Sequence, residues 1–412
     1  MLLKESIKQA YLEQQSLLEL RRTNAILRTF LSGYKPASGH VEVISGIRRS
    51  GKSTLMALIR EQFYPGAACF NFEDSRVYGF EVQDFQKLDE IMPRETPAYF
   101  FDEIQNVEKW ELYIRQLHDR GSKVFITGSN ASLLSKELGT RLTGRNLRHE
   151  LYPFSYQEFL SYFRAAPSVE TFDRYLDEGG FPEYLAQNDR MILQNLFKDI
   201  ILRDIAVRYG VRNVKTLMET ALFLITNIGK ETTYNSIRKQ FNMGAANTAS
   251  DYIHWLEDSW LIFQVQRFSW SAKARNANPR KIYGIDTGLV HANTLSFSAD
   301  RGRRLENAVY LHLRRTGKEI FYFREDKECD FVVFEQQKCV MAIQVCEQVT
   351  PDNQKREMEG LIEAMKYFGL DEGMIITRNQ EDTIAVGKKN IRLVPAYQFL
   401  IRNDIAAIAL RE

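Results

Sequence analysis

Eight consecutive residues in the first part of the chain have the types and spacing of a phosphate-binding loop. The segment GIRRSGKS at 46–53 fits the pattern G-x-x-x-x-G-K-[ST], with an apolar strand-like run before it and an amphipathic helix after it. The two glycines of such a loop let backbone N–H groups turn inward around a β-phosphate, and the helix N-terminus adds partial positive charge. Lys52 would reach the β- and γ-phosphate oxygens, and Ser53 would offer its hydroxyl to Mg²⁺. The predicted nucleotide-binding residues are Gly46, Ile47, Arg48, Arg49, Ser50, Gly51, Lys52, Ser53 and Thr54.

Two acids end a second apolar segment, AYFFDE at 98–103. Asp102 would hold Mg²⁺ through water together with Ser53, and Glu103 would polarise the attacking water as general base. A pair of solvated carboxylates is the alternative, but a phosphate-binding loop predicts an acid at the end of another buried strand. The two segments together predict Mg²⁺-dependent hydrolysis of a nucleoside triphosphate. The chain has no N-K-x-D motif for reading guanine, so ATP is the expected nucleotide.

Polar residues after the next apolar segment are candidates for contact with the γ-phosphate. The segment FITGSN ends at Asn130, and in AAA-type ATPases a polar residue at this place orients the attacking water. Ser129 is the other candidate, although Gly-Ser-Asn is also a typical turn. Arg141 and Arg145 follow, and either could be an arginine finger offered to a neighbouring subunit or an ordinary surface cation. The candidate catalytic residues are therefore Lys52, Glu103, Asn130 and Arg145.

Strand-like and helix-like segments alternate around these residues. Nearly all-apolar strands that are separated by helices indicate a parallel sheet covered on both faces, which places the chain in the α/β class. The strand-like runs lie at 41–45, 67–73, 98–103 and 123–129. The preceding residues, 1–32, have a helical pattern with Leu17 and Leu27 on its apolar stripe.

The composition is that of a folded protein with two or three domains. The chain has 412 residues, of which 44% are hydrophobic and 26% charged, and its net charge is +2. No run approaches the roughly 18 apolar residues of a membrane span, and the first residues lack the apolar core of a signal peptide. The four cysteines have no CxxC spacing, which favours free thiols in a reducing compartment over disulfides or a metal site. We therefore expect a cytoplasmic protein without a membrane segment.

A basic segment at 207–281 contains eleven Lys and Arg against five Asp and Glu, a net charge of +6. Three helical stretches followed by two strands predict a winged helix-turn-helix, and the charge favours duplex DNA as a partner. The expected recognition helix carries Asn247 and Thr248 at its start, but acids further along it would repel phosphate. We therefore expect the main contact in the basic turn between the strands, through Lys273, Arg275, Arg280 and Lys281. Helix-turn-helix folds also serve as protein-interaction modules, which remains an alternative.

The chain resembles a family of prokaryotic AAA+-like P-loop ATPases whose C-terminal half is a domain of unknown function. In that half a winged helix is joined to a fold similar to PD-(D/E)XK nucleases. The resemblance implies an ATPase core, a helical lid and an association with nucleic acid. It rests on GIRRSGKST (46–54), FFDEIQNV (100–107), ITGSNASLLS (126–135), LTGRN (142–146), LYPFSYQEFL (151–160), GGFPE (179–183), KIYGIDTGL (281–289) and RRLENAVYLHL (303–313).

The nuclease-like pattern can be tested at individual residues. An active site of this kind needs an acid ending one strand, a second acid on the next strand and a lysine two residues further on. Glu306 and Asp330 are available, but Gln344 stands where the second acid belongs and Cys346 where the lysine belongs. A neutral amide does not replace a carboxylate at a divalent metal, and a thiol does not replace an ammonium. We expect a nuclease-like fold without nuclease activity, unless another lysine such as Lys327 or Lys338 reaches the site.

The predicted organisation therefore has five parts. They are an N-terminal helical segment (1–35), an AAA+-like core (36–154), a helical lid (155–210), a winged helix (211–290) and a restriction-endonuclease-like α/β domain (291–412). The predicted function is ATP hydrolysis that drives a conformational change in a DNA-associated machine or switch, with a homo-oligomer as a further expectation. An ATP-gated nuclease and a nucleotide-dependent protein-interaction switch are the alternatives.

Overall fold

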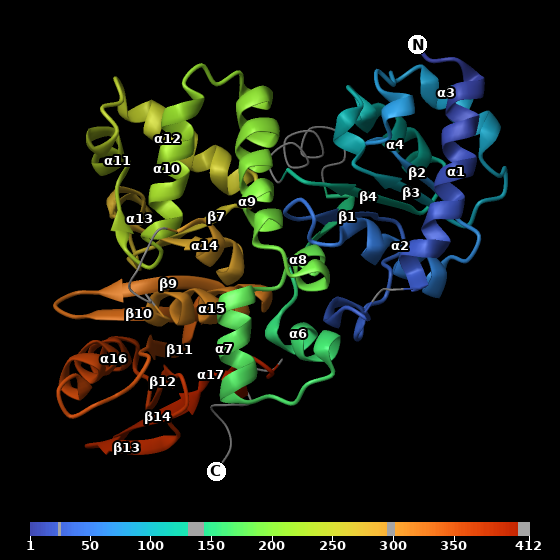
Figure 1. The fold of residues 1–412 in the computed structure, drawn as a ribbon. Coiled ribbons are helices and arrows are strands. Elements are labelled where there is room, and N and C mark those ends of the chain that lie inside the picture. The colour runs from blue at the N-terminus through green and yellow to red at the C-terminus, as the bar shows by residue number, and fades with distance from the viewer. Residues whose placement is uncertain (24–25, 131–143, 295–300, 403–412) are drawn as a thin grey trace. The chain divides into compact units, whose positions relative to one another are not determined.

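The computed structural model describes residues 1–23, 26–130, 144–294 and 301–402, and the chain forms two compact units (Figure 1). The first unit consists of Met1–Tyr152 with Asp258–Trp260. The second consists of Pro153–Glu257 and the chain from Leu261 onward. Among the described residues, no helix combines the length and the apolar character needed to cross a bilayer.

The first unit is built on a parallel sheet. Its strands are β1 (Val41–Ser45), β2 (Ala68–Asn71), β3 (Tyr99–Asp102), β4 (Val124–Gly128) and β5 (Asn146–Glu150). Its helices are α1 (Lys4–Thr23), η1 (Thr29–Leu31), α2 (Lys52–Phe63), η2 (Ser75–Val77), α3 (Asp84–Ile91), η3 (Ile104–Asn106) and α4 (Trp110–Asp119). The strand order is β2-β3-β4-β1-β5, and every pairing is parallel, as the apolar runs predict.

Alternate residues of the strands β1 to β4 enter two different cores. On β3 and β4, Phe101 and Ile126 belong to a core closed by α1, α3 and α4. Their neighbours Phe100 and Phe125 belong to a second core, closed by α2 and η1. Because side chains alternate across a strand, an apolar residue at every position requires helices on both faces of the sheet.

Strand order also places the polar strand ends side by side. β4 lies between β1 and β3, with Ser45 of β1 opposite Gly128 and Phe101 of β3 opposite Ile126. The carboxyl end of β4 therefore lies between the loop that follows β1 and the acids that end β3. In open α/β sheets this edge is where ligands bind.

The buried stripe of α1 differs from the sequence expectation. Among the described side chains of the helix, the buried apolar residues are Ile7, Ala10 and Tyr11, and they join the core of α3 and α4. Leu17 and Leu27 are 50% and 69% exposed. The apolar pattern was too weak to fix the face of the helix, because Leu12 and Leu17 point outward beside a stripe that includes the polar Gln14.

The second unit begins with helices and continues with two sheets. Its helical elements are α6 (Tyr156–Phe163), α7 (Val169–Glu178), α8 (Pro182–Gln187), α9 (Arg190–Asp199), η4 (Ile200–Val207, a π-helix), α10 (Val214–Thr226), α11 (Tyr234–Gln240), α12 (Ala246–Asp258), α13 (Ala272–Ala277), α14 (Thr287–Asn293), α15 (Arg301–Arg315), α16 (Gln354–Phe368) and α17 (Ala396–Phe399). A three-stranded antiparallel sheet has the order β6-β8-β7, formed by β6 (Glu231–Thr232), β7 (Ile262–Gln266) and β8 (Arg280–Gly284).

The second sheet has six strands in the order β13-β14-β12-β11-β10-β9 and contains both parallel and antiparallel pairs. Its strands are β9 (Glu319–Arg324), β10 (Glu328–Glu335), β11 (Lys338–Val345), β12 (Glu372–Thr377), β13 (Asp382–Val386) and β14 (Lys389–Pro395). The helix α16 covers it through Leu361, Ala364 and Met365. The strands β9, β10 and β11 form a three-stranded antiparallel meander, and β13 and β14 form a hairpin.

The basic turn between β7 and β8 is a short helix. Ser271 caps α13 by accepting a hydrogen bond from the Ala274 N–H at 3.4 Å. The Asn-rich composition predicted a turn because Asn and Pro break most helices, but the Ser cap and three alanines support this single helical segment.

Three segments that carry the family resemblance meet within the second unit. Asp286 accepts hydrogen bonds from Gly180 N at 2.7 Å and Leu289 N at 2.8 Å. Asn307 donates to the Gly284 carbonyl and accepts from the Gly284 amide, at 3.0 and 2.7 Å. The motifs at 179–183, 281–289 and 303–313 are thus joined by buried polar contacts.

Candidate active site

The predicted phosphate-binding loop connects β1 to α2, and each of its two glycines has its own steric reason. Gly51, at the N-cap of α2, has φ +95°, a left-handed conformation that disfavours other residues. Gly46 is needed for close approach, because a Cβ there would lie 2.1 Å from the Leu151 carbonyl oxygen. Arg49 also has a positive φ, of 64°, so the loop combines left-handed residues with a helix N-terminus in the way that anion-binding loops do.

Lys52 lies at the centre of the site. Its ammonium donates to the carbonyls of Gly46 and Ile47, each at 3.2 Å, and lies 3.3 Å from Glu103 Oε1. The side chain is only 4% exposed. The loop that should bind phosphate therefore already touches the predicted general base through this lysine.

Glu103 is held ionised in a buried position. Burial opposes its charge, but the Lys52 ammonium and the Gln105 side chain outweigh burial and lower the pKa of Glu103. Its backbone is left-handed, with φ +52°, directly after β3 ends. A base must be deprotonated to accept a proton from water, so the lowered pKa agrees with the predicted role.

Asp102 forms polar contacts with three neighbours. Its Oδ1 accepts from the Thr127 hydroxyl at 2.5 Å, its Oδ2 accepts from Asn71 Nδ2 at 3.2 Å, and Ser53 also donates to it. Burial and the charge of Glu103 raise the pKa of Asp102. The two predicted metal ligands, Ser53 and Asp102, are therefore brought together by the fold.

Thr127 was absent from the predicted site. Its hydroxyl accepts from the Glu103 amide at 2.9 Å and donates to Asp102, so one buried side chain fixes both acids. A polar residue inside an otherwise apolar strand was the available sequence signal. Its importance depends on β4 lying beside β3, which the sequence pattern did not determine.

The other candidates have different surroundings. Ser129 and Asn130 are both buried just after β4. Arg48 pairs with Glu73 at 2.6 Å, and Thr54 is half-buried on α2. Arg145 is 54% exposed and pairs with Asp119 at 3.2 Å, while Arg141 lies outside the described residues.

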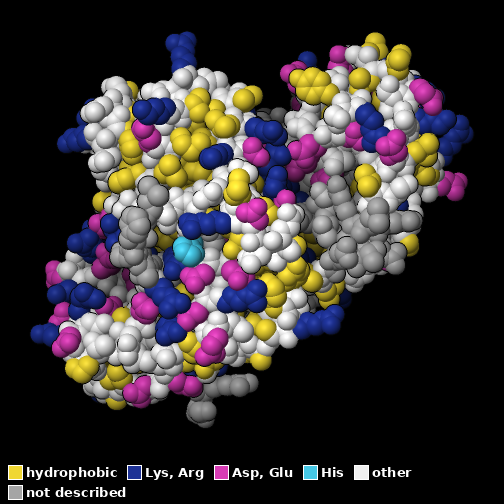
Figure 2. Space-filling model, viewed as in Figure 1, with side chains coloured by type: hydrophobic (Ala, Val, Ile, Leu, Met, Phe, Trp, Pro, Cys, Tyr) yellow, Lys and Arg dark blue, Asp and Glu magenta, His cyan; other side chains and the backbone are white. Residues whose placement is uncertain are grey.

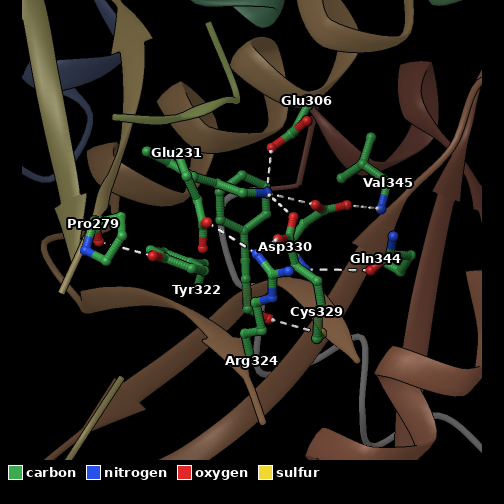
Figure 3. A network of polar contacts seen from close by, with 12 residues as sticks. Glu231, Pro279, Glu306, Tyr322, Arg324, Cys329, Asp330, Gln344 and Val345 are labelled. Atoms are coloured by element: carbon green, nitrogen blue, oxygen red, sulfur yellow. Dashed lines mark hydrogen bonds and ion pairs between the residues drawn. The ribbon is translucent and has the colours of Figure 1, made fainter. Parts of the chain in front are cut away.

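The second unit contains the acids of the nuclease-like pattern, together with a lysine that the sequence did not connect with them (Figure 3). Lys281 of β8 is 2% exposed. Its ammonium lies 2.9 Å from Asp330 and 3.2 Å from Glu306. Glu328 lies 2.8 Å from the same nitrogen. Lysine and acids come from three elements, β8, α15 and β10, which is why no local motif revealed them.

The charges of this cluster depend on each other. Burial disfavours the ammonium, but the charge of Asp330 and those of its neighbours outweigh burial and raise the pKa of Lys281. Burial and the charge of Asp330 raise the pKa of Glu306 to about 7, although Lys281 and the Tyr283 hydroxyl favour its ionised form. Tyr283 donates to Glu306 at 2.6 Å.

The two positions that depart from the nuclease-like pattern make structural contacts. Gln344 accepts from the Asp330 amide at 3.2 Å and donates to Glu357 at 3.1 Å. The Cys346 thiol donates to the Gln348 carbonyl at 3.0 Å, and burial raises its pKa to about 11. Lys327 pairs with Glu359 instead, and Lys338 is exposed, so the suggestion that one of them approaches these acids is wrong.

The expected wing contact also requires correction. Lys281 is buried among carboxylates, and Arg280 donates to Tyr234 and Gln264 at 2.9 and 3.0 Å. Arg275 donates to the Ser269 carbonyl, which leaves Lys273 as the exposed cation of the four. A charge count along the sequence does not distinguish buried ion pairs from surface cations.

A parallel sheet with this loop after β1 and these acids at the end of β3 is the arrangement of a P-loop NTPase fold. Residues 38–160 match the family model of an AAA domain, and residues 169–300 match a domain of unknown function, DUF8612. The chain belongs to the same family as the uncharacterized protein MJ1544 of Methanocaldococcus jannaschii, with 35% identity over 392 residues that cover 87% of this chain and 88% of the relative.

One further relative is similar in sequence over most of its length, and one solved structure shows a weak likeness. An uncharacterized protein of Haemophilus influenzae is 33% identical over 319 residues, which cover 71% of this chain and 79% of that protein. The replication initiator DnaA bound to AMPPCP and single-stranded DNA aligns over 54% of this chain and 83% of its own, with 14% identity and a TM-score of 0.28. A likeness of that size supports no conclusion about this chain.

Proposed function

We propose that this protein binds ATP with Mg²⁺ at the loop 46–54 and hydrolyses it. The observation that carries the proposal is the convergence of Lys52, Asp102 and Glu103 at one edge of a parallel sheet. Lys52 lies 3.3 Å from Glu103, and the Thr127 hydroxyl bonds to Asp102 and to the Glu103 amide at 2.5 and 2.9 Å. Asp102 and Ser53 would hold Mg²⁺, whose positive charge would offset charge on the phosphates. Asn130 and an arginine such as Arg145 from a second copy are the remaining proposed contributors.

The geometry divides the work between the lysine and the glutamate. When ATP binds, the Lys52 ammonium would exchange Glu103 for the phosphate oxygens, because its other two acceptors are neutral carbonyls. Glu103 would then be free to accept a proton from the attacking water. ATP binding would therefore separate the Lys52–Glu103 pair, which spans 3.3 Å, and make both groups available together.

Glu103→Gln tests this assignment. It removes the proton acceptor while retaining the shape of the side chain, so ATP turnover should fall about 100-fold or more. ATP affinity should be retained, since Lys52 loses a competing partner. Glu95→Gln, at an exposed loop residue of the same unit, is the matched control and should leave both quantities unchanged. Parental turnover in Glu103→Gln would exclude Glu103 as the base.

Duplex DNA is a second proposed ligand, through α11 and α12 in a winged-helix arrangement rather than through the turn after β7. Lys239 is exposed and Arg238 half-buried on the last turn of α11. Asn247, Asp251 and His254 lie along one exposed face of α12, while Glu257 is turned inward to Gln264. Figure 2 shows an apolar area with Lys and Arg side chains at its margins in the upper left part of the molecule, where Figure 1 labels α10.

Salt-dependent binding distinguishes the two DNA contacts. Neutralising Arg238 and Lys239 together should reduce the slope of log affinity against log salt by about 2. Neutralising Lys273 and Arg275 should change it less, because Arg275 is occupied by Ser269. Absence of salt-dependent binding in the parent would favour a nucleotide-dependent protein-interaction switch instead.

We do not propose a nuclease reaction for the cluster around Lys281. The ammonium already occupies the space between Glu306 and Asp330, and Gln344 is committed to Asp330 and Glu357. Among the described residues no group of His, Cys, Asp and Glu is arranged to hold a metal ion. The helices α6–η4 and the six-stranded sheet are proposed as the lid and the nuclease-like fold that the sequence predicts.

A further inference from the structure

Arg28 lies outside every motif of the sequence, yet its side chain reaches the phosphate-binding loop. It precedes the short helix η1 and is 4% exposed. Its Nη1 donates to the Ser50 carbonyl at 2.9 Å, and its Nη2 donates to the Tyr152 carbonyl at 2.7 Å. A buried guanidinium that donates to a backbone carbonyl fixes the direction of that carbonyl, since turning it away would leave buried polar groups unpaired.

The contact with Ser50 determines where the next amide points. The Ser50–Gly51 peptide is trans, so its C=O and N–H point in opposite directions. Arg28 holds the carbonyl toward the protein interior, and the Gly51 N–H therefore faces the opposite side, where α2 begins. In phosphate-binding loops the N–H groups at the helix N-terminus are the phosphate ligands.

The contact with Tyr152 fixes the other side of the same loop. Leu151 donates its amide to the Ser45 carbonyl at 2.7 Å, and its own carbonyl lies against Gly46. Arg28 thus connects Ser50, near the end of the loop, with the segment packed against its start. A Cβ on Gly51 would come within 3.4 Å of Arg28 Nη1, so the guanidinium lies directly behind the loop.

We propose that Arg28 is a positioning residue for phosphate binding: it orients the Ser50–Gly51 peptide so that the Gly51 amide faces the β-phosphate. The inference rests on the proposed function in taking ATP as the ligand. Arg28, which lies about 20 positions before the loop, would thus contribute to nucleotide affinity together with the loop residues. Arg28 does not touch the nucleotide, and its effect passes through the backbone.

Arg28→Ala separates this role from a general structural one. A mispositioned amide weakens contact with the ground state and the transition state alike, so KM for ATP should rise about ten- to a hundredfold while kcat stays near the parental value. Loss of folded protein would instead lower kcat at unchanged KM. Direct titration should show the same loss of affinity for ATP and ADP, because both carry a β-phosphate.

Two further variants complete the experiment. Arg28→Lys keeps the charge but offers no planar pair of donors to two carbonyls, so its KM should lie between those of the parent and Arg28→Ala. Added guanidinium at millimolar concentration should restore part of the affinity of Arg28→Ala. Arg60→Ala is the matched control, because Arg60 also donates to a backbone carbonyl of the first unit, Ala67 at 2.7 Å, away from the loop.

The outcomes are distinct from those that test hydrolysis. A parent that binds ATP without hydrolysing it would refute the proposed activity and leave the affinity test of Arg28 in place. Parental affinity for both nucleotides in Arg28→Ala, or equal losses in Arg28→Ala and Arg60→Ala, would overturn the positioning role. If Arg28→Ala does not fold, unchanged KM in the folded Arg28→Lys variant would overturn it equally.

Discussion

Replacing Thr127 by valine should impair the function of both Asp102 and Glu103, although neither acid is itself substituted. Thr127 is fully buried, and valine retains its shape while removing the hydroxyl. Two hydrogen bonds are lost, one donated to Asp102 at 2.5 Å and one accepted from the Glu103 amide at 2.9 Å. Asp102 then keeps Asn71 and Ser53 as partners, whereas the Glu103 amide loses its acceptor.

The magnitude follows from the charge on the acceptor. A hydrogen bond to an ionised group contributes about 1.5–3 kcal/mol, and tenfold in rate corresponds to about 1.4 kcal/mol. Because this hydrogen-bond energy is lost where Glu103 and Mg²⁺ must be aligned for the reaction, kcat should fall roughly ten- to a hundredfold. The concentration of Mg²⁺ that gives half-maximal turnover should rise, because Asp102 is no longer held in one orientation.

Steady-state ATP hydrolysis over a range of Mg²⁺ concentrations is the assay. Thr127→Ser keeps the hydroxyl and should remain close to the parent. Thr220→Val, at a buried threonine that bonds to Thr216 within α10, controls for the general cost of this change. Equal turnover and equal Mg²⁺ dependence in the parent and Thr127→Val would refute the idea that Thr127 positions the acids.

Three further results are expected. Lys281→Met should lower the free energy of unfolding of the chain by about 3–5 kcal/mol, because it leaves buried carboxylates unpaired, and adding Asp330→Asn should recover part of the loss; denaturant titration showing no recovery would contradict the ion-pair account. The pKa of Glu306 is raised from 4.5 to about 7 in the folded chain, so its contribution to stability is complete below pH 4.5 and is lost as the pH rises through 7. Thermal unfolding measured from pH 5 to 8 should therefore show a steeper decline of the melting temperature in the parent than in Glu306→Gln, and parallel declines would contradict this account. Gly46→Ala should abolish ATP binding, since the new Cβ meets the Leu151 carbonyl, whereas Gly244→Ala has open space and should bind normally in the same titration.

The sequence predicted four strands of the first unit, β1 to β4, because two local signals agreed there, but it missed β5, whose residues are mostly exposed. Apolar runs gave the strands, and the loop pattern fixed which strand carried Lys52 and Ser53. Asp102 and Glu103 could be found because a strand end is also a local feature. What the pattern could not determine was the order of strands, and that order is the reason Thr127 lies between the loop and the acids.

The contacts that were missed join segments far apart in the chain. Arg28 and Ser50 are separated by 22 residues, and Lys281 and Asp330 by 49. Arg28 belongs to no motif and Lys281 belongs to a basic turn, and in both settings a cation is more typical of the surface. Burial distinguishes a surface cation from a buried, hydrogen-bonded one, and burial depends on the tertiary fold.

The weakest predictions concerned segments without strong periodicity. The strand β13 has mostly exposed residues, so it carries no apolar run that distinguishes it from a loop. The segment at 272–277 was read as a turn from its Asn content, although a capped helix forms there. In the second unit the two strands expected for the wing, β7 and β8, have mostly buried residues and do form.

Mg²⁺-dependent release of phosphate from ATP by the purified chain, compared with Lys52→Ala and measured across protein concentration, tests the central claim most directly. The account predicts turnover in the parent that disappears without Mg²⁺. It predicts no detectable ATP binding or turnover in Lys52→Ala, because Lys52 is the cation proposed to contact the β- and γ-phosphate oxygens. A rise in turnover per chain with protein concentration would further support an arginine supplied by a second copy. Turnover in Lys52→Ala equal to the parent, or a parent that neither binds nor hydrolyses ATP, would contradict it.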